Sequence, residues 1–124
     1  MALRREALRL YLVTDPVLCA GPGVVETVRR AVAGGVSMVQ LRDKQATTEE
    51  RVVLARELMQ VLDGTGVPLI INDDVEAALA AGADGAHIGQ GDGSPERARA
   101  LLGPERILGL SCETADRVAA TKGM

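Results

Sequence analysis

Short apolar runs rich in β-branched residues alternate along the chain with stretches in which apolar residues recur every three or four positions. The short runs predict five strands, at residues 10–14, 37–41, 69–71, 85–88 and 107–110. The periodic stretches predict a helix after each strand, at residues 24–33, 47–62, 75–81, 94–102 and 113–120. Local signals mark the helix starts: Thr47 and Glu50 have capping-box spacing, Asp74 is a suitable cap, and Pro95 suits a first helical position. The chain is therefore predicted to repeat a strand–helix unit five times.

This alternation predicts an α/β fold, in which helices cover a parallel sheet. Two architectures remain open from the pattern alone: a doubly wound sheet, or part of a (β/α)₈ barrel of the TIM-barrel type. No GxGxxG motif follows the first strand, which weakens the dinucleotide-binding version of the doubly wound sheet. No linker or low-complexity segment interrupts the pattern, so residues 1–124 are expected to form a single domain.

Composition and charge narrow the classes of function. Apolar residues make up 47% of the chain, charged residues make up 25%, and the formal net charge is -3, as in an ordinary soluble globular protein. Acidic and basic residues are interleaved and Tyr11 is the only aromatic residue, so nucleic-acid binding is not expected. No segment approaches the ~18 apolar residues of a membrane span, and we expect a cytoplasmic protein. Cys19 and Cys112 are isolated, which argues against a disulfide framework or a zinc site.

Polar side chains follow the predicted strands at their carboxyl ends, where parallel α/β folds gather their chemistry. Gln40, Arg42 and Lys44 alternate at the end of the second strand, and we expect them to share one side of an extended segment. Their amide, guanidinium and ammonium groups suit a substrate that carries both a polyphosphate and a hydrogen-bonding ring. Merely solvated charges at a strand end are an equally good interpretation of these residues alone.

Two carboxylates are candidates for a magnesium site. Asp73 and Asp92 follow the third and fourth predicted strands, which are consecutive in the chain. Proteins usually hold Mg²⁺ through one or two carboxylates, and phosphate oxygens and water complete its coordination. A helix cap is the alternative for Asp73, but we assign that role to Asp74. A Gly-Asp-Gly turn is the better interpretation of Asp92 when that residue is considered alone.

Two further polar residues belong to the last two predicted strands. His87 lies between Ala86 and Ile88 in the fourth strand, where a structural role is favoured over catalysis. Ser111 follows the fifth strand and has no base nearby in the sequence. We therefore expect Ser111 to form a hydrogen bond to a substrate rather than to act as a nucleophile.

Five segments, in this order and at this spacing, resemble the thiamine phosphate synthase family. They are residues 11–15 (YLVTD), 39–44 (VQLRDK), 71–73 (IND), 84–90 (DGAHIGQ) and 108–111 (LGLS). Each segment is a weak signal alone, but five in sequence are a strong one. The resemblance extends from about residue 10 to residue 120, and it implies a (β/α)₈ barrel of which this chain holds about the first five βα units.

The resemblance implies a transferase of thiamine biosynthesis. Its small-molecule substrates would be 4-amino-5-hydroxymethyl-2-methylpyrimidine diphosphate and a thiazole phosphate, and its products would be thiamine phosphate and pyrophosphate. It further implies Mg²⁺ as the cofactor, with Asp73 and Asp92 as its ligands. The residues implied to bind the substrates are Gln40 and Ser111 near the pyrimidine, and Arg42, Lys44 and Asn72 at the diphosphate. Of these, Arg42 and Lys44 are also expected to be catalytic.

The length of the chain departs from this family. A closed barrel usually needs roughly 200 residues or more, so we expect an incomplete barrel. Five strands cannot close, and the first and fifth strands would expose unpaired edges. We therefore expect either a piece of a longer gene product or a homo-oligomer in which copies complete one another, with poor turnover by an isolated chain.

Three other functions remain open. A thiazole tautomerase-like relative of the same fold would need no diphosphate-bound metal. Lys44 could form a Schiff base, as in barrel aldolases, provided that its amine were desolvated. A non-catalytic truncated barrel could bind the pyrimidine diphosphate without converting it.

Overall fold

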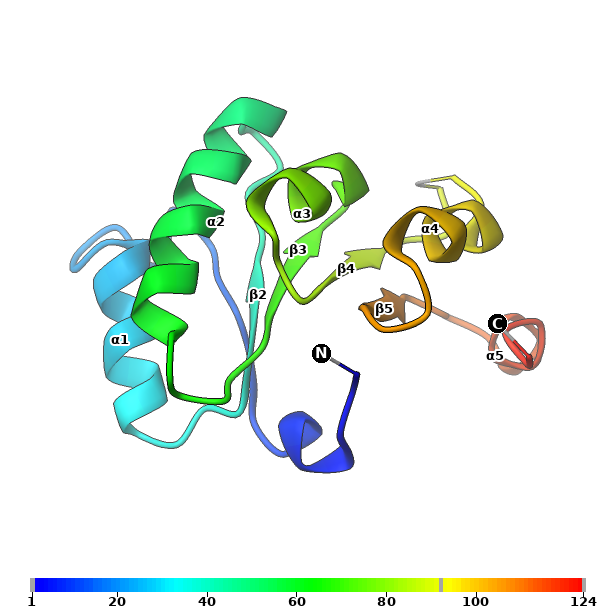
Figure 1. The fold of residues 1–124 in the computed structure, drawn as a ribbon, viewed down its shortest axis with the longest axis horizontal. Coiled ribbons are helices and arrows are strands. Elements are labelled where there is room, and N and C mark those ends of the chain that lie inside the picture. Colours follow the sequence, from blue (N-terminus) through cyan, green and yellow to red (C-terminus); the bar gives the residue numbers. More distant parts are fainter. Residues whose placement is uncertain (1, 92, 124) are drawn as a thin grey trace.

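A computed structural model describes residues 2–91 and 93–123 of the chain. In this part, five strands alternate with five α-helices after a short 3₁₀ helix, η1 (Figure 1). The elements are η1 (Arg5–Leu8), β1 (Tyr11–Val13), α1 (Val24–Ala33), β2 (Met38–Leu41), α2 (Thr48–Leu62), β3 (Leu69–Asn72), α3 (Val75–Ala81), β4 (Gly85–Ile88), α4 (Pro95–Leu102), β5 (Ile107–Leu110) and α5 (Ala115–Ala119). No helix among these has the length and apolar character needed to cross a membrane.

The strands form one sheet in the order β1-β2-β3-β4-β5, and every neighbouring pair is parallel. A doubly wound sheet reverses its strand order at one point, whereas this order follows the chain without reversal. The sheet is therefore an arc of the TIM-barrel type, and the expected α/β fold is confirmed. Among the described residues, β1 and β5 each pair with one neighbour only.

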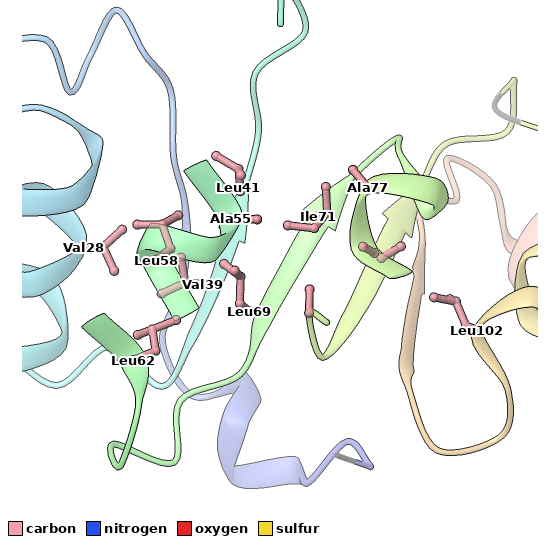
Figure 2. Close-up of a cluster of buried hydrophobic side chains, with 13 residues drawn as sticks. Val28, Val39, Leu41, Ala55, Leu58, Leu62, Leu69, Ile71, Ala77 and Leu102 are labelled. Carbon is pink, nitrogen blue, oxygen red and sulfur yellow. The ribbon is translucent and has the colours of Figure 1, made fainter. Parts of the chain in front are cut away.

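The outer face of the sheet carries the main hydrophobic core. Side chains alternate between the two faces of a strand, and those on the outer face pack against α1 to α4 (Figure 2). The buried strand residues of this layer are Val39, Leu41, Leu69, Ile71 and Ala86. The buried helix residues opposite them include Val28, Leu58, Leu62, Ala77 and Leu102. Complete burial of an aliphatic side chain is worth about 1.5–3 kcal/mol, so this layer supplies much of the stability.

The inner face holds a smaller cluster, whose buried members are Met38, Ile70 and Ile107. Tyr11 and Ala7 pack against them, and Ala7 belongs to η1. Ser37 fixes this helix by donating a hydrogen bond from Oγ to the carbonyl of Ala7 at 2.8 Å. Figure 1 shows η1 beside the amino ends of the strands. The sequence pattern did not predict η1, because four residues are too few to show a period.

Helix starts follow the predicted local signals. Thr47 Oγ1 accepts a hydrogen bond from the backbone of Glu50, whose carboxylate accepts one from the backbone of Thr47, so the capping box is closed. Asp74 caps α3, and Ser94 caps α4 just before Pro95. The predicted bounds agree with the observed ones to within two residues at each end, with the largest difference at α5.

Candidate active site

The site residues gather at one rim because all five strands are parallel and end there. The register aligns Asn72 with His87 and His87 with Gly109. Since aligned residues of parallel strands face the same side, these three residues share the inner face. Gln40 and Ser111 follow the same alternation. The site therefore opens on the inner face, on the other side of the sheet from the main core.

Gln40 is held inside the sheet arc and is not a solvated strand-end residue. It is 5% exposed, and its Nε2 donates a hydrogen bond to the Tyr11 hydroxyl at 2.9 Å. Burial raises the pKa of Tyr11, and the hydrogen bond from Gln40 offsets only part of that rise. The phenol is therefore neutral near pH 7 and anchors the amide at the inner face.

Lys44 and Asp73 meet across the ends of β2 and β3. The Lys44 Nζ lies 2.7 Å from the Asp73 Oδ2, and the side chains are 53% and 21% exposed. A pair this exposed adds little stability, but it places an ammonium and a carboxylate together at the rim. The exposed, ion-paired ammonium of Lys44 is also unlike the desolvated amine that a Schiff base requires, which disfavours the aldolase alternative.

The expected extended segment from Gln40 through Arg42 to Lys44 is wrong. β2 ends one residue after Gln40, and Lys44 lies in the turn that follows. Arg51 of α2 stabilises this turn by donating from Nε and Nη2 to the carbonyl of Asp43, at 3.0 and 2.8 Å. The chain bends here because a helix residue binds its backbone, which periodicity does not reveal.

Arg42 and Asn72 belong to the same two strand ends as this pair and differ in burial. The backbone N–H of Arg42 donates to the Thr14 hydroxyl at 3.2 Å, and its side chain is partly exposed. Within residues 2–91 and 93–123 the guanidinium of Arg42 forms no ion pair, so it can receive an anion. Asn72 is 8% exposed at the end of β3 and brings an amide to the same rim.

A buried network connects the Lys44 turn to the end of β3. The Oδ2 of Asp74, which is 8% exposed, accepts hydrogen bonds from the Thr48 hydroxyl at 2.9 Å and from Arg51 Nη1 at 3.1 Å. Burial raises the pKa of Asp74, but these hydrogen bonds, the cap to α3 and the Arg51 charge together bring it below its ordinary value. Arg51 binds the carbonyl of Asp43, which precedes Lys44, and the carboxylate of Asp74, which follows Asp73. It therefore holds the backbone of Lys44 and the backbone of Asp73 in a fixed relative position.

Replacing Asp74 by alanine is expected to lower the free energy of unfolding by about 2–4 kcal/mol, since the cap is lost and the partly buried Arg51 loses its carboxylate partner. Asp74→Asn keeps a capping oxygen and should cost less. Because the folded-state pKa is lowered, the carboxylate contributes its full stability above its unfolded-state pKa of about 4, and this contribution disappears as the pH falls through the folded-state value. Urea denaturation at a series of pH values would check this. An Asp74→Asn protein that loses stability in acid as steeply as the wild type would contradict it.

One carboxylate at the described part of the rim, that of Asp73, could serve as a ligand of a magnesium ion. Asp73 offers a hard carboxylate oxygen, and its backbone φ of 64° lies in the left-handed region that few non-glycine residues adopt. Among the described residues, no group of three or more His, Cys, Asp or Glu side chains could enclose a metal. A magnesium ion would therefore also need phosphate and water oxygens as ligands, as magnesium sites in proteins usually do. Asp92, the second expected ligand, lies outside the described residues.

Ser111 is held by residues of the β4 segment. The His87 Nε2 lies 2.8 Å from the Ser111 Oγ, and the Gln90 Nε2 donates to the Ser111 carbonyl at 2.8 Å. The sequence shows no base near Ser111, but the neighbouring strand brings a histidine to it. The structural role favoured for His87 thus includes a contact with a site residue.

Sequence reasoning did not assign a part in the site to Tyr11, Thr48, Arg51 or Gln90. Thr48 and Arg51 lie three residues apart in the first turn of α2, so they face one side of the helix. That spacing was a usable signal, but nothing in it shows that the end of β3 lies against this side. Only the packing of α2 on α3 brings them to Asp74.

A family model described as "Thiamine monophosphate synthase" matches residues 10–123. The chain belongs to the thiamine monophosphate synthase family. This confirms the resemblance that the five segments indicated.

Individual relatives of the family agree with this assignment. A thiamine-phosphate synthase from Vibrio parahaemolyticus is 53% identical over 114 residues, which cover 92% of this chain and 55% of that protein. A probable thiamine biosynthetic bifunctional enzyme of the rice chloroplast is 44% identical over 115 residues, covering 91% of this chain and 21% of that protein. The solved structure of a thiamine phosphate pyrophosphorylase from Pyrococcus furiosus matches with a TM-score of 0.85 and 33% identity, covering 94% of this chain and 55% of that one. The chain thus spans about half the length of the Vibrio parahaemolyticus protein and of the Pyrococcus furiosus structure.

Proposed function

We propose that this chain forms the part of a thiamine phosphate synthase that binds the pyrimidine diphosphate and promotes the loss of pyrophosphate. The complete protein then joins the pyrimidine to a thiazole phosphate, as a transferase. The observation that carries the proposal is the meeting of Lys44 and Asp73 at 2.7 Å, at the two strand ends that also carry Arg42 and Asn72. Membership of the family supports the same reaction.

Arg42 and Lys44 act on the leaving group. When the bond from the pyrimidine methylene carbon to the diphosphate breaks, both electrons stay on the oxygen, so negative charge grows on the pyrophosphate. The guanidinium and ammonium donate charge-assisted hydrogen bonds to these oxygens, and the Asn72 amide adds a neutral donor. These contacts strengthen as the charge develops, so they lower the barrier as well as bind the substrate.

Gln40 and Ser111 hold the pyrimidine ring with an amide and a hydroxyl. The thiazole nitrogen supplies the electron pair for the new carbon–nitrogen bond to the methylene carbon. With a carboxylated thiazole, CO₂ is lost as well. Such a step needs little acid–base chemistry, and its rate depends on keeping the cationic pyrimidine close to its nucleophile.

Magnesium is the cofactor that this proposal requires. Asp73 would hold it together with Asp92 and the diphosphate oxygens, and the ion would neutralise diphosphate charge. Because the Lys44 ammonium contacts the same carboxylate, Asp73 also orients Lys44 toward the diphosphate.

The remaining features of the proposal concern partners and location. The substrates are small molecules, and the protein does not bind nucleic acid. The reaction takes place in the cytoplasm. In the complete protein, further strands cover the edges of β1 and β5, supplied by the same polypeptide or by a second copy in a homo-oligomer.

The test is pyrophosphate and thiamine phosphate formation by the complete protein to which this sequence belongs. Product should require Mg²⁺ and both substrates, and Arg42→Ala should lower kcat/KM by about 100-fold, since it removes a donor to the developing charge. Arg29→Ala, an exposed arginine on α1, is the matched control and should keep wild-type activity. Pyrophosphate release that needs no thiazole phosphate would indicate hydrolysis and contradict the proposal.

A further inference from the structure

His87 lies on the inner face near the carboxyl end of β4, and the proposed mechanism gives it no role. It is partly buried on β4, where its backbone carbonyl accepts a hydrogen bond from the Asp73 N–H at 2.8 Å. Its ring reaches across to the neighbouring strand, and Nε2 lies 2.8 Å from the Ser111 hydroxyl. His87 thus connects the end of β3 to the end of β5.

Gly109 makes room for this ring. A Cβ atom at Gly109 would lie 2.3 Å from the His87 Nδ1 and 3.2 Å from Cγ and Cε1, well inside contact distance. The imidazole therefore lies directly against the backbone of β5. Gly109 and Ser111 are two residues apart and face the same side. The His87 ring therefore packs against Gly109 and contacts the hydroxyl of Ser111 on the same face.

Ser111 is fixed in the backbone as well as in the side chain. Its N–H donates to the Ile88 carbonyl at 3.0 Å, and Gln90 binds its carbonyl at 2.8 Å. With the backbone held, rotation of the hydroxyl is the remaining freedom of this exposed residue, and a serine hydroxyl otherwise rotates to suit any partner. The 2.8 Å contact to the His87 Nε2 restricts that freedom, because it gives the hydroxyl one preferred partner.

We infer that His87 is a positioning residue, which holds the Ser111 hydroxyl in one orientation toward the heteroaromatic ring of the substrate. The inference rests on the proposed function, because it assumes that Ser111 contacts the bound pyrimidine. His87 itself contacts Ser111 rather than the reacting atoms. Its contribution to catalysis therefore passes through the serine.

Two substitutions of His87 separate positioning from packing. Glutamine is one methylene longer than asparagine and can bring an amide to the place of Nε2, whereas the asparagine amide reaches only the place of Nδ1. In the complete protein, His87→Asn should lower kcat/KM roughly 10- to 100-fold, because a misplacement of about 1 Å can cost that much. His87→Gln should recover most of the loss.

A double-mutant cycle with Ser111→Ala gives the deciding measurement. Since His87 acts through Ser111, the His87→Asn/Ser111→Ala protein should be no slower than Ser111→Ala alone. Losses that multiply in the double variant, or a His87→Gln protein as slow as His87→Asn, would overturn the inference, provided that thermal melting shows each variant folded. The wild type run in the same assay separates the two proposals. An inactive wild type overturns both, whereas an active wild type with multiplying losses overturns only the role of His87.

Discussion

Asp73→Asn is expected to lower kcat/KM for thiamine phosphate formation by about 100- to 1,000-fold while the protein stays folded. The substitution removes the charge that faces Lys44 at 2.7 Å and the carboxylate proposed to hold Mg²⁺. Asparagine is the right replacement because it tolerates the left-handed backbone, φ 64°, that Asp73 adopts. Alanine there would add backbone strain to the loss of charge, and the two effects could not be separated.

Steady-state kinetics over a range of Mg²⁺ concentrations would measure this effect. The variant should remain slow even at high Mg²⁺, since an amide oxygen is a weaker ligand and gives Lys44 no ion pair. Asp63→Asn, at the exposed carboxyl end of α2, is the matched control and should behave as the wild type. Near-normal turnover by Asp73→Asn would remove Asp73 from the metal site and from the mechanism.

Gly85→Ala is expected to cost about 3 kcal/mol or more of stability, the upper end for overpacking. Gly85 begins β4 and is aligned with Ile107 of β5. An added Cβ would lie 2.0 Å from the Ile107 carbonyl oxygen and 2.8 Å from its Cβ. Backbone cannot yield as a flexible side chain can, so the two strands would have to separate and lose their hydrogen bonds.

Urea denaturation of the same protein with Gly21→Ala as control would check this. An added Cβ at Gly21 meets nothing within 4 Å and its backbone needs no left-handed conformation, so that variant should stay within about 1 kcal/mol of the wild type. Equal midpoints for the two variants would show that β4 and β5 are not packed as described. Because β5 carries Ser111 to His87, Gly85→Ala should also weaken catalysis.

The Arg51 network gives these predictions a common structural basis. Arg51 binds the carbonyl of Asp43 and the carboxylate of Asp74, and so fixes the turn of Lys44 against the residue after Asp73. If Lys44 and Asp73 act as proposed, they need such support, because a shift of about 1 Å at the rim can cost two orders of magnitude in rate. We therefore expect the proposed chemistry to depend on Arg51, a helix residue to which the proposal gives no substrate contact.

The sequence by itself determined the five strands and the five α-helices, with their ends to within two residues, although not η1. Helix starts depend on contacts within four residues, such as the capping box of Thr47 and Glu50 and the cap at Asp74, so they are visible in local sequence. The same holds for the strand–helix alternation and for the position of the polar residues after each strand. The family was also recognisable, because five short segments recur at fixed spacing.

Tertiary structure alone decided how these parts meet. The strand–helix pattern left a doubly wound sheet and a barrel arc open. The family resemblance implied the barrel, and the strand order, which is set by contacts between residues far apart in the chain, decided it. The turn at Lys44 depended on Arg51, and the partner of Ser111 on the register that sets His87 beside Gly109. Such contacts depend on the packing of whole elements rather than on local propensity. The sequence therefore predicts which side chains reach the rim, and the fold decides which of them touch.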